Sequence, residues 1–410
     1  MKIILLAPPR GYLTNPIAQP PLGLLYLSSI LDSRNIENEV VDLAAGSKIP
    51  EDGDIYGFSL TTSDLGEVLP IAKMLKGMGK TIIAGGPHPS TSGDMECFDA
   101  IVMGEGERAI IEVISDYPNL RQVYSFPLIE DLDSIPFPDR GKVSHDYTDS
   151  TFGGVKSTGL ITSRGCPYLC AFCASKKIWG GSVRFRSPGN VCQEILEVRD
   201  ELGIFAFRIH DDQFTIRRRE DLLELLDFFT ATDIVWRASA RVDRVDPELL
   251  QKMKEAGCKL LSFGVESGDQ KVLDVLRKNI SVEHSKDALR WSREAGIDTR
   301  VLLMVGMPGE TKDTTDRTIQ LLEETNDYWT SIALTEFLPL YGTPIMDNPE
   351  KFGVKVKMID TREGWTLYNS EGLREFSNPL EIEGLSFDDM VQSKVRLRDY
   401  ILQTKKENRG

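Results

Sequence analysis

Short apolar segments alternate with amphipathic helical segments along most of the chain, and this alternation restricts the fold more than any other feature. In the first block the candidate strands are Ile3–Ala7, Glu39–Leu43, Ile55–Leu60, Thr81–Gly85 and Ala100–Met103, and the candidate helices are Gly23–Ser33, Leu65–Met78 and Glu107–Asp116. Such alternation is typical of parallel strands joined by crossover helices. The sequence therefore predicts an α/β fold that begins with a Rossmann-like, doubly wound parallel sheet.

One crossover in this block is too short to contain a helix. Only about ten residues, rich in Gly, Pro and acidic side chains, separate Leu43 from Ile55, whereas a helical crossover between parallel strands needs a dozen or more. We therefore expect a trimmed sheet that lacks its second crossover helix.

The second block repeats the strand-then-helix pattern six times. Its strands are expected near Gly159–Ser163, Ala206–His210, Ile234–Ala238, Leu260–Val265, Thr299–Val305 and Ser331–Leu338, with helices near 189–202, 219–231, 247–256, 283–295 and 312–325. Six units predict a partial (β/α)6 barrel of the TIM type, with functional groups at the carboxyl ends of its strands. The expected domains are 1–125 for the sheet, 126–156 for a linker, 157–344 for the barrel and 345–410 for a short C-terminal extension.

Composition excludes several classes of function. The net charge of −15 opposes a nucleic-acid surface, which needs clustered Lys and Arg. The apolar run at the N-terminus is too short to span a membrane and lacks the cleavage region of a signal peptide. Six cysteines in 410 residues are too few for a secreted disulfide framework. These features predict a cytoplasmic protein that acts on a small molecule.

Three of the six cysteines lie on one short segment, Cys166-Pro-Tyr-Leu-Cys170-Ala-Phe-Cys173, directly after the first expected barrel strand. Three thiolates can hold an iron–sulfur cluster while one iron keeps an open coordination position. Structural zinc is the alternative, but it needs a fourth ligand, usually from a second pair of cysteines that the chain lacks. The remaining cysteines, Cys97, Cys192 and Cys258, are expected in the core.

Candidate functional residues follow the other barrel strands, where the carboxyl ends meet. They are Asp211 and Asp212 after the second strand, Arg241 after the third, Glu266 and Ser267 after the fourth, Gly306 after the fifth and Pro339 after the sixth. Carboxylates at such positions suit an ammonium group or ribose hydroxyls. Each also has an ordinary structural interpretation: an acidic helix start, a strand-ending turn or a surface salt bridge.

The cysteine spacing Cys166-x3-Cys170-x2-Cys173, with Phe172 before the last cysteine, resembles the radical S-adenosylmethionine (SAM) superfamily. This resemblance implies that the three cysteines bind a [4Fe-4S] cluster whose open iron holds SAM. An electron from the cluster then breaks the sulfur–carbon bond and releases a 5′-deoxyadenosyl radical. It also implies that SAM contacts Phe172, Asp211, Asp212, Arg241, Glu266, Ser267, Gly306 and Pro339, with Asp212 at the amine, Arg241 at the carboxylate and Glu266 at the ribose.

The first block resembles the cobalamin-binding domain that precedes the barrel in class B radical SAM methyltransferases. The resemblance is carried by Pro20-Pro-Leu-Gly-Leu-Leu-Tyr-Leu, Gly85-Gly-Pro-His-Pro and Gly104-Glu-Gly-Glu. It implies cobalamin contacts from Leu22, Gly23, Ser59, Thr61, Thr62, Gly85, Gly86, His88, Gly104 and Glu105. No Asp-x-His-x-x-Gly follows the first strand, so no lower axial histidine is expected there, and His88 either approaches cobalt or caps the sheet.

Together these resemblances predict a cobalamin-dependent radical SAM methyltransferase. One SAM would provide the radical that takes hydrogen from an unactivated carbon, and a second would re-methylate the cobalt. A flavodoxin or ferredoxin is the expected electron donor. The first alternative is a radical SAM dehydratase, cyclase, isomerase or desaturase without cobalamin, and the second is a non-catalytic cobalamin or cluster sensor. A tRNA-modifying enzyme is disfavoured by the acidic charge.

Overall fold

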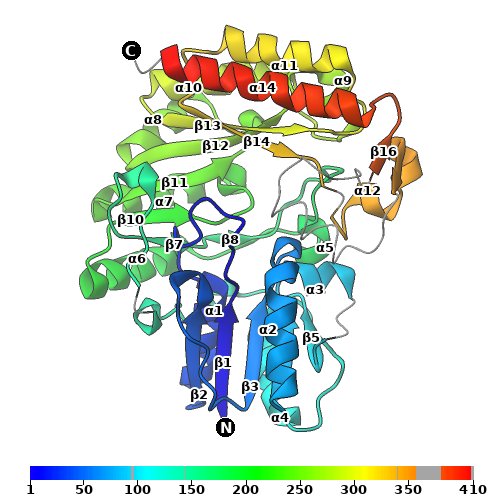
Figure 1. Ribbon diagram of the computed structural model, residues 1–410. Helices are drawn as coiled ribbons and strands as arrows, with labels where there is room; N and C mark the ends of the chain where they lie inside the picture. Colours follow the sequence, from blue (N-terminus) through cyan, green and yellow to red (C-terminus); the bar gives the residue numbers. More distant parts are fainter. Residues whose placement is uncertain (94–96, 144, 339, 357–379, 408–410) are drawn as a thin grey trace. The chain divides into compact units, whose positions relative to one another are not determined.

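The structure is a computed structural model that describes residues 1–93, 97–143, 145–338, 340–356 and 380–407 (Figure 1). The described chain is an α/β protein with two six-stranded sheets. It divides into two compact units. The first contains Met1–Gly165 and Lys177–Arg208, and the second contains Cys166–Lys176 and the described chain after Ile209.

The first sheet is parallel throughout, with the strand order β2-β1-β3-β4-β5-β6. Its strands are β1 (Lys2–Ala7), β2 (Glu37–Asp42), β3 (Ile55–Ser59), β4 (Thr81–Gly85), β5 (Ala100–Met103) and β6 (Val123–Ser125). Its helices are α1 (Leu22–Ser33), α2 (Leu65–Gly77), α3 (Pro87–Ser92) and α4 (Gly106–Asp116). The predicted Rossmann-like sheet is therefore confirmed.

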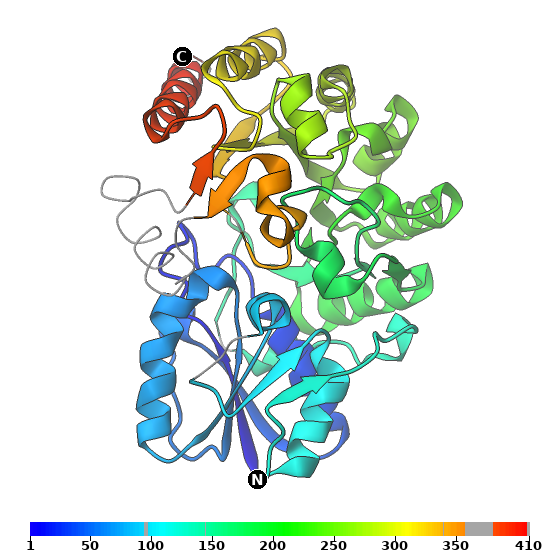
Figure 2. The ribbon, with the colours of Figure 1, turned by 90° about the vertical axis from the view of Figure 1, so that its right-hand side faces the viewer.

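Strand β1 buries side chains on both faces of this sheet. Ile3 and Leu5 belong to the core under α1 and α4, whereas Ile4 and Leu6 belong to the core under α2. Figure 2 shows helices on either side of the strands. Because successive side chains of a strand point to opposite faces, a sheet that is covered on both sides needs an uninterrupted apolar strand such as this one.

The short crossover is also as expected. Between β2 and β3 the only helical turn is the 3-10 helix η1 (Leu43–Ala45), started by Asp42, whose side chain accepts a hydrogen bond from Ala44 N. Strand β1 lies between β2 and β3, so the strand order reverses there. In open α/β sheets ligands bind at the carboxyl ends of strands near such a reversal.

The second sheet has the order β14-β13-β12-β11-β10-β7, which follows the sequence from one edge to the other, as in a partial barrel. Its strands are β7 (Ser157–Leu160), β10 (Ala206–Ile209), β11 (Val235–Ala240), β12 (Cys258–Glu266), β13 (Asp298–Val305) and β14 (Ser331–Glu336). The helices between them are α6 (Pro188–Leu202), α7 (Arg219–Thr232), α8 (Pro247–Glu255), α9 (Gln270–Val275), α10 (Val282–Glu294) and α11 (Lys312–Glu324).

One difference from the sequence prediction concerns the first barrel strand. Strand β7 ends at Leu160, and a separate two-residue strand β8 (Ser163–Arg164) pairs antiparallel with β9 (Arg184–Phe185). The cysteine segment therefore begins after a hairpin strand, and the short helix α5 (Ser175–Trp179) follows it.

The chain after the barrel contains α12 (Pro344–Asp347), the antiparallel pair β15 (Val354–Val356) and β16 (Leu380–Ile382), and the long helix α14 (Phe387–Glu407). Ser386 caps α14: its Oγ accepts from Asp389 N at 3.1 Å and donates to the Asp389 carboxylate at 2.6 Å. Thr315 of α11 donates to Ser393 of α14 at 2.8 Å, so the two helices pack together. None of the described helices has the length and apolar character of a membrane span.

Candidate active site

The cysteine segment is fixed by backbone hydrogen bonds to two other parts of the second unit. Ala171 N donates to Leu276 O at 2.8 Å, and Ile345 N donates to Ala171 O at 3.0 Å. Within the segment, Cys173 N donates to Cys170 O at 3.1 Å. The loop is therefore held by the turn after α9 and by the start of α12.

The three cysteines are unpaired, and Cys170 is buried, whereas Cys166 and Cys173 are partly buried. Burial raises the pKa of the Cys166 thiol and raises that of Cys173 to about 11. Among the described residues, no three His, Cys, Asp or Glu side chains are close enough to bind a single metal ion. A loop of buried thiols fits an iron–sulfur cluster, because iron offsets the cost of burying thiolates.

Arg241 packs against the cysteine segment. Its guanidinium carbon lies 3.6 Å from the centre of the Tyr168 ring, and Arg244 Nε donates to the Tyr168 hydroxyl at 2.6 Å. Arg241 also donates to Asp243 at 2.9 and 3.2 Å and to Lys278 O at 2.9 Å. It is only 6% exposed, so it forms a buried ion pair that supports the loop.

The end of β12 places Glu266 and Ser267 in different surroundings. Glu266 has a positive φ of 66°, and its Oε1 accepts from Lys278 Nζ at 2.8 Å. The Ser267 hydroxyl accepts from Asp269 N at 3.1 Å and lies 3.4 Å from Thr318 Oγ1. The Glu266 carboxylate thus lies beside an ammonium group, while the Ser267 hydroxyl stabilises the start of α9.

Asp212 lies near the cysteines, as the sequence predicts. Ser175 Oγ donates to its Oδ2 at 3.1 Å. Burial is the main cause of the raised pKa of Cys173, and the Asp212 charge adds to it. Asp212 is exposed, whereas its neighbour Asp211 is 5% exposed. Of the two acids, Asp212 is the one accessible to a ligand.

Gly306 and Pro339 were expected to contact SAM. Gly306 has a φ of 80°, and its N donates at 2.8 Å to the carboxylate of Glu310. A Cβ atom at Gly306 would lie 2.6 Å from the sulfur of Met390 on α14, and the positive φ by itself favours glycine at this position. Pro339 lies outside the described residues.

In the first unit, the residues expected to contact cobalamin gather at the carboxyl ends of β3, β4 and β5, with Leu22 and Gly23 at the start of α1. Gly86, with a φ of 98°, approaches the backbone of the β3 end so closely that a Cβ would lie 2.7 Å from Leu60 N. Gly85 O accepts from Leu60 N at 2.8 Å. The positive φ and close packing at Gly86 account for a glycine at this strand end. The remaining members are Ser59, Thr61, Thr62, His88, Gly104 and Glu105.

The His88 side chain is 4% exposed, and hydroxyl groups contact both of its ring nitrogens. Nδ1 lies 3.1 Å from Thr62 Oγ1, and Nε2 lies 3.2 Å from Ser92 Oγ. Its backbone N donates to Leu60 O at 3.0 Å. This environment is that of a histidine that caps the sheet, because neither ring nitrogen faces open space.

Glu105 is the centre of a buried ion-pair cluster. Its carboxylate accepts from Arg164 at 2.6 Å, from Arg184 at 2.9 and 3.0 Å, and from Ile129 N at 2.7 Å. These donors outweigh burial and lower the pKa of Glu105. Arg164 also donates to Glu107 at 2.6 Å. The side chain of Glu105 therefore braces β8 and β9.

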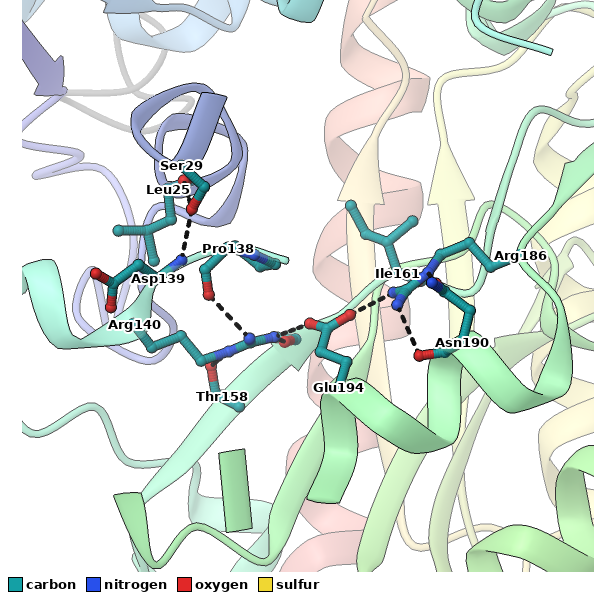
Figure 3. Close-up of polar contacts among 11 residues, drawn as sticks. Leu25, Ser29, Pro138, Asp139, Arg140, Thr158, Ile161, Arg186, Asn190 and Glu194 are labelled. Atoms are coloured by element: carbon teal, nitrogen blue, oxygen red, sulfur yellow. Dashed lines mark hydrogen bonds and ion pairs between the residues drawn. The ribbon is translucent and has the colours of Figure 1, made fainter. Parts of the chain in front are cut away.

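A second buried cluster surrounds Glu194 of α6 (Figure 3). Its carboxylate accepts from Arg140 Nη2 at 2.5 Å and from Arg186 Nη1. Arg140 donates further to Thr158 at 2.9 Å and to Gly159 O at 2.7 Å, which joins the segment before the barrel to β7. Arg186 thus links the chain after the cysteines to α6.

Two family models match the parts of the chain that contain the cysteine segment and the strand ends of the first sheet. The model of the Radical SAM superfamily matches residues 160–322, and that of the B12 binding domain matches residues 18–114. An uncharacterized methyltransferase of Pyrococcus horikoshii is 30% identical over 360 residues, which cover 79% of this chain and 78% of the relative. The chain belongs to the radical SAM superfamily. With its B12-binding domain, it is a cobalamin-dependent, methyltransferase-like member that uses SAM, a [4Fe-4S] cluster and cobalamin.

Two further matches are a curated relative and a solved structure. The anaerobic magnesium-protoporphyrin IX monomethyl ester cyclase of Cereibacter sphaeroides is 31% identical over 271 residues, covering 59% of this chain and 44% of the relative. The solved structure of the radical SAM methyltransferase TsrM from Kitasatospora setae aligns with a TM-score of 0.68 and 19% identity, covering 87% of this chain and 77% of that one. The structural match supports the fold alone.

Several residues of the candidate active site were not predicted from the sequence of this radical SAM enzyme. Tyr168 lies inside the cysteine segment and stacks on Arg241, but its role follows only from the folded contact. Lys278 lies in the turn after α9, and no spacing in the sequence connects it with Glu266. Glu310, three residues after Met307, is recognisable only by its burial and its bond to Gly306.

Proposed function

We propose that this radical SAM enzyme methylates an unactivated carbon of a small-molecule substrate. The observation that carries the proposal is the presence of two strand-end sites on one chain. One is the loop of three unpaired cysteines beside Asp212, and the other is the glycine-rich edge of β3, β4 and β5. The methyltransferase name of the Pyrococcus relative favours methyl transfer.

When bound, the cluster supplies the electron that cleaves SAM, and cobalamin supplies the methyl group. In this proposal Cys166, Cys170 and Cys173 hold the irons. Asp212 is exposed next to the cysteines, so its carboxylate is placed to accept the SAM amino group. Glu266 lies at the end of β12, and in this proposal its carboxylate binds a ribose hydroxyl.

Arg241 has a supporting role in this scheme. Its Nε and Nη2 already donate to Asp243 and to the Lys278 carbonyl, and its face covers Tyr168. A guanidinium so engaged fixes the cysteine segment and adds positive charge near the thiolates, which lowers the pKa of Cys166 against the larger effect of burial. This charge helps the loop to hold an anionic thiolate set.

The cobalamin site would be built mainly from backbone groups. Gly86 and Gly104 both have positive φ values, of 98° and 86°. Gly86 packs closely against the end of β3, whereas a Cβ at Gly104 would meet no atom within 4 Å, so there is room at the end of β5. Gly104 N donates a hydrogen bond to Ser90 Oγ at 2.9 Å, which fixes the loop after β5. Ser59 and Thr62 add hydroxyl groups at the end of β3. Such an edge admits the flat and phosphate-bearing parts of a large cofactor.

The proposed electron donor is a flavodoxin or ferredoxin, and the proposed location is the cytoplasm. Unpaired cysteines that ligate iron persist in a reducing compartment, where disulfides are rare. The acidic net charge of −15 is compatible with a small-molecule substrate and opposes an RNA substrate.

The test is anaerobic incubation of the reconstituted protein with SAM, cobalamin and a reductant. The protein should form 5′-deoxyadenosine and transfer a labelled methyl group. Cys170→Ala should lose iron and form no 5′-deoxyadenosine. Cys192→Ala, which alters a buried cysteine of α6 outside the loop, should keep both. An iron-free wild-type protein after reconstitution would refute the proposal.

The second candidate is a radical cyclisation or related reaction. It is favoured by the cyclase of Cereibacter sphaeroides, which matches 271 residues. The two candidates differ in one measurement, because a cyclase would form 5′-deoxyadenosine without placing a methyl group from SAM on the product.

A further inference from the structure

Glu266 adopts a backbone conformation that needs support. It is the last residue of β12, its φ is 66°, and the pairing of β12 with β13 shifts register between Gly264 and Glu266. Residues other than glycine rarely adopt a left-handed conformation, and they keep it only where the surrounding contacts impose it. A contact partner of the Glu266 side chain is therefore part of the site.

Lys278 is that partner. Its Nζ lies 2.8 Å from Glu266 Oε1, and both side chains are only 9% exposed. The pair lies against Gly264, where a Cβ would come within 2.5 Å of Glu266 Oε1 and 2.7 Å of Lys278 Nζ. Two buried charges at this distance depend on each other, since removal of one leaves the other uncompensated.

The turn after α9 directs Lys278 toward Glu266. Its neighbours Arg277 and Asn279 both have a φ of 53°, so two left-handed residues flank the lysine. Lys278 N donates to Leu273 O at 3.0 Å at the end of α9. The backbone at Lys278 is therefore part of a tight turn.

The same turn also holds the cysteine segment. Leu276 O accepts from Ala171 N at 2.8 Å, and Lys278 O accepts from Arg241 Nη2 at 2.9 Å. Lys278 Nζ lies 5.6 Å from the centre of the Phe172 ring, within the range of a cation–π contact. One turn thus contacts the cysteine loop, the arginine behind that loop and the carboxylate at the end of β12.

We infer that Lys278 is a positioning residue for SAM. It holds the Glu266 carboxylate toward the ribose and fixes the position of this carboxylate relative to the cysteine loop. The inference rests on the proposed function, because it takes Glu266 as the ribose-binding group. Lys278 acts through Glu266, so its loss weakens every ligand that carries the ribose, whether or not that ligand has an amino acid group.

The experiment measures affinity for SAM and for 5′-deoxyadenosine with the anaerobically reconstituted protein. 5′-Deoxyadenosine keeps the ribose and lacks the amino acid part. Lys278→Met should weaken both ligands by about 10- to 100-fold, the range for a lost hydrogen bond to a charged group. Lys271→Met, which alters an exposed lysine of α9, should match the wild type. In a Glu266→Gln background, Lys278→Met should add less than about twofold.

Three outcomes overturn the inference. Lys278→Met could bind both ligands within about twofold of the wild type. It could lose affinity for SAM alone, which would mean that Lys278 contacts the amino acid group directly. Its effect could persist undiminished in the Glu266→Gln background. Iron content must equal that of the wild type for each variant. If Lys278→Met loses its cluster, Lys278→Arg replaces it, with a smaller loss that is again equal for the two ligands.

Failure of the proposed function would look different. In that case the wild-type protein, with its cluster assembled, would not bind SAM at all. Binding by the wild type together with an unaffected Lys278→Met variant would reject only the role of Lys278.

Discussion

Replacement of Glu194 by glutamine should destabilise the first unit strongly. The Glu194 side chain is 1% exposed and lies between Arg140 and Arg186, which are 3% and 5% exposed. Glutamine keeps the shape of the side chain but removes its charge, and two buried guanidinium groups then lose their common counter-ion. Breaking a buried ion pair by removing one partner costs about 3–5 kcal/mol.

The structure favours the lower end of this range. Without Glu194, Arg140 keeps its bonds to Thr158 and Gly159 O, at 2.9 and 2.7 Å. Arg186 keeps its bond to Asn190 at 2.6 Å. We therefore expect a loss of about 3 kcal/mol in the free energy of unfolding. For a unit of roughly 200 residues, about 2–4 °C per kcal/mol gives a Tm lower by about 6–12 °C.

The assay is thermal unfolding of the cluster-free protein under anaerobic conditions, so that iron does not contribute. Glu197→Gln is the matched control, because Glu197 is exposed on the same helix and accepts a hydrogen bond from Gln193 at 3.0 Å. It should change stability by less than about 0.5 kcal/mol. Adding Arg186→Met to Glu194→Gln should restore part of the loss. Equal melting of the Glu194 and Glu197 variants would refute the reasoning.

Three other changes test the second unit and the cofactor edge. Burial raises the pKa of Glu310 to about 7, above its value in the unfolded chain, so its contribution to stability is present in acid and is lost as pH rises through 7. Between pH 5 and 8, Glu310→Gln should therefore lose less stability than the wild type, by about 3 kcal/mol in the free energy of unfolding, and its Tm should fall less. The exposed control Glu323→Gln should follow the wild type. Gly268→Ala would place a Cβ 2.5 Å from a backbone oxygen of α11 and should lower stability by about 1–3 kcal/mol in urea unfolding, whereas Gly189→Ala meets no atom within 4 Å and should be close to neutral. His88→Ala should leave the electron paramagnetic resonance spectrum of bound Co(II) cobalamin unchanged, because both ring nitrogens contact hydroxyl groups; an altered cobalt–nitrogen coupling would contradict this.

The fold was predictable because its strands are short apolar runs with strong local boundaries. Strands β4 and β5 have the predicted limits, and helices α6 and α8 begin within one residue of the predicted starts, capped by Ser187 and Asp246. Strand β6 was not predicted, since three residues give no periodic signal and its existence depends on pairing with β5. Local patterns do not report such distant pairing.

The candidate site was predictable in part. Spacing along the chain identified the cysteines, and strand ends identified Asp212 and Glu266. The surroundings of these groups were not predictable, because they come from residues distant in sequence. The Lys278–Glu266 pair spans a turn with two left-handed residues, and the three donors to Glu105 come from the linker, β8 and β9. No pattern in the sequence alone reveals which side chain neutralises a buried charge.

The pairing of β8 with β9 has a consequence for how the enzyme acquires iron. Ser163 faces Phe185 and Arg164 faces Arg184, so the two ends of the intervening segment are tied together whether or not its thiols carry metal. A segment with tethered ends loses less entropy when its contents become ordered. We therefore expect iron delivery to be a late event in the life of the protein, in which a folded chain can be loaded, stripped by oxygen and loaded again without refolding.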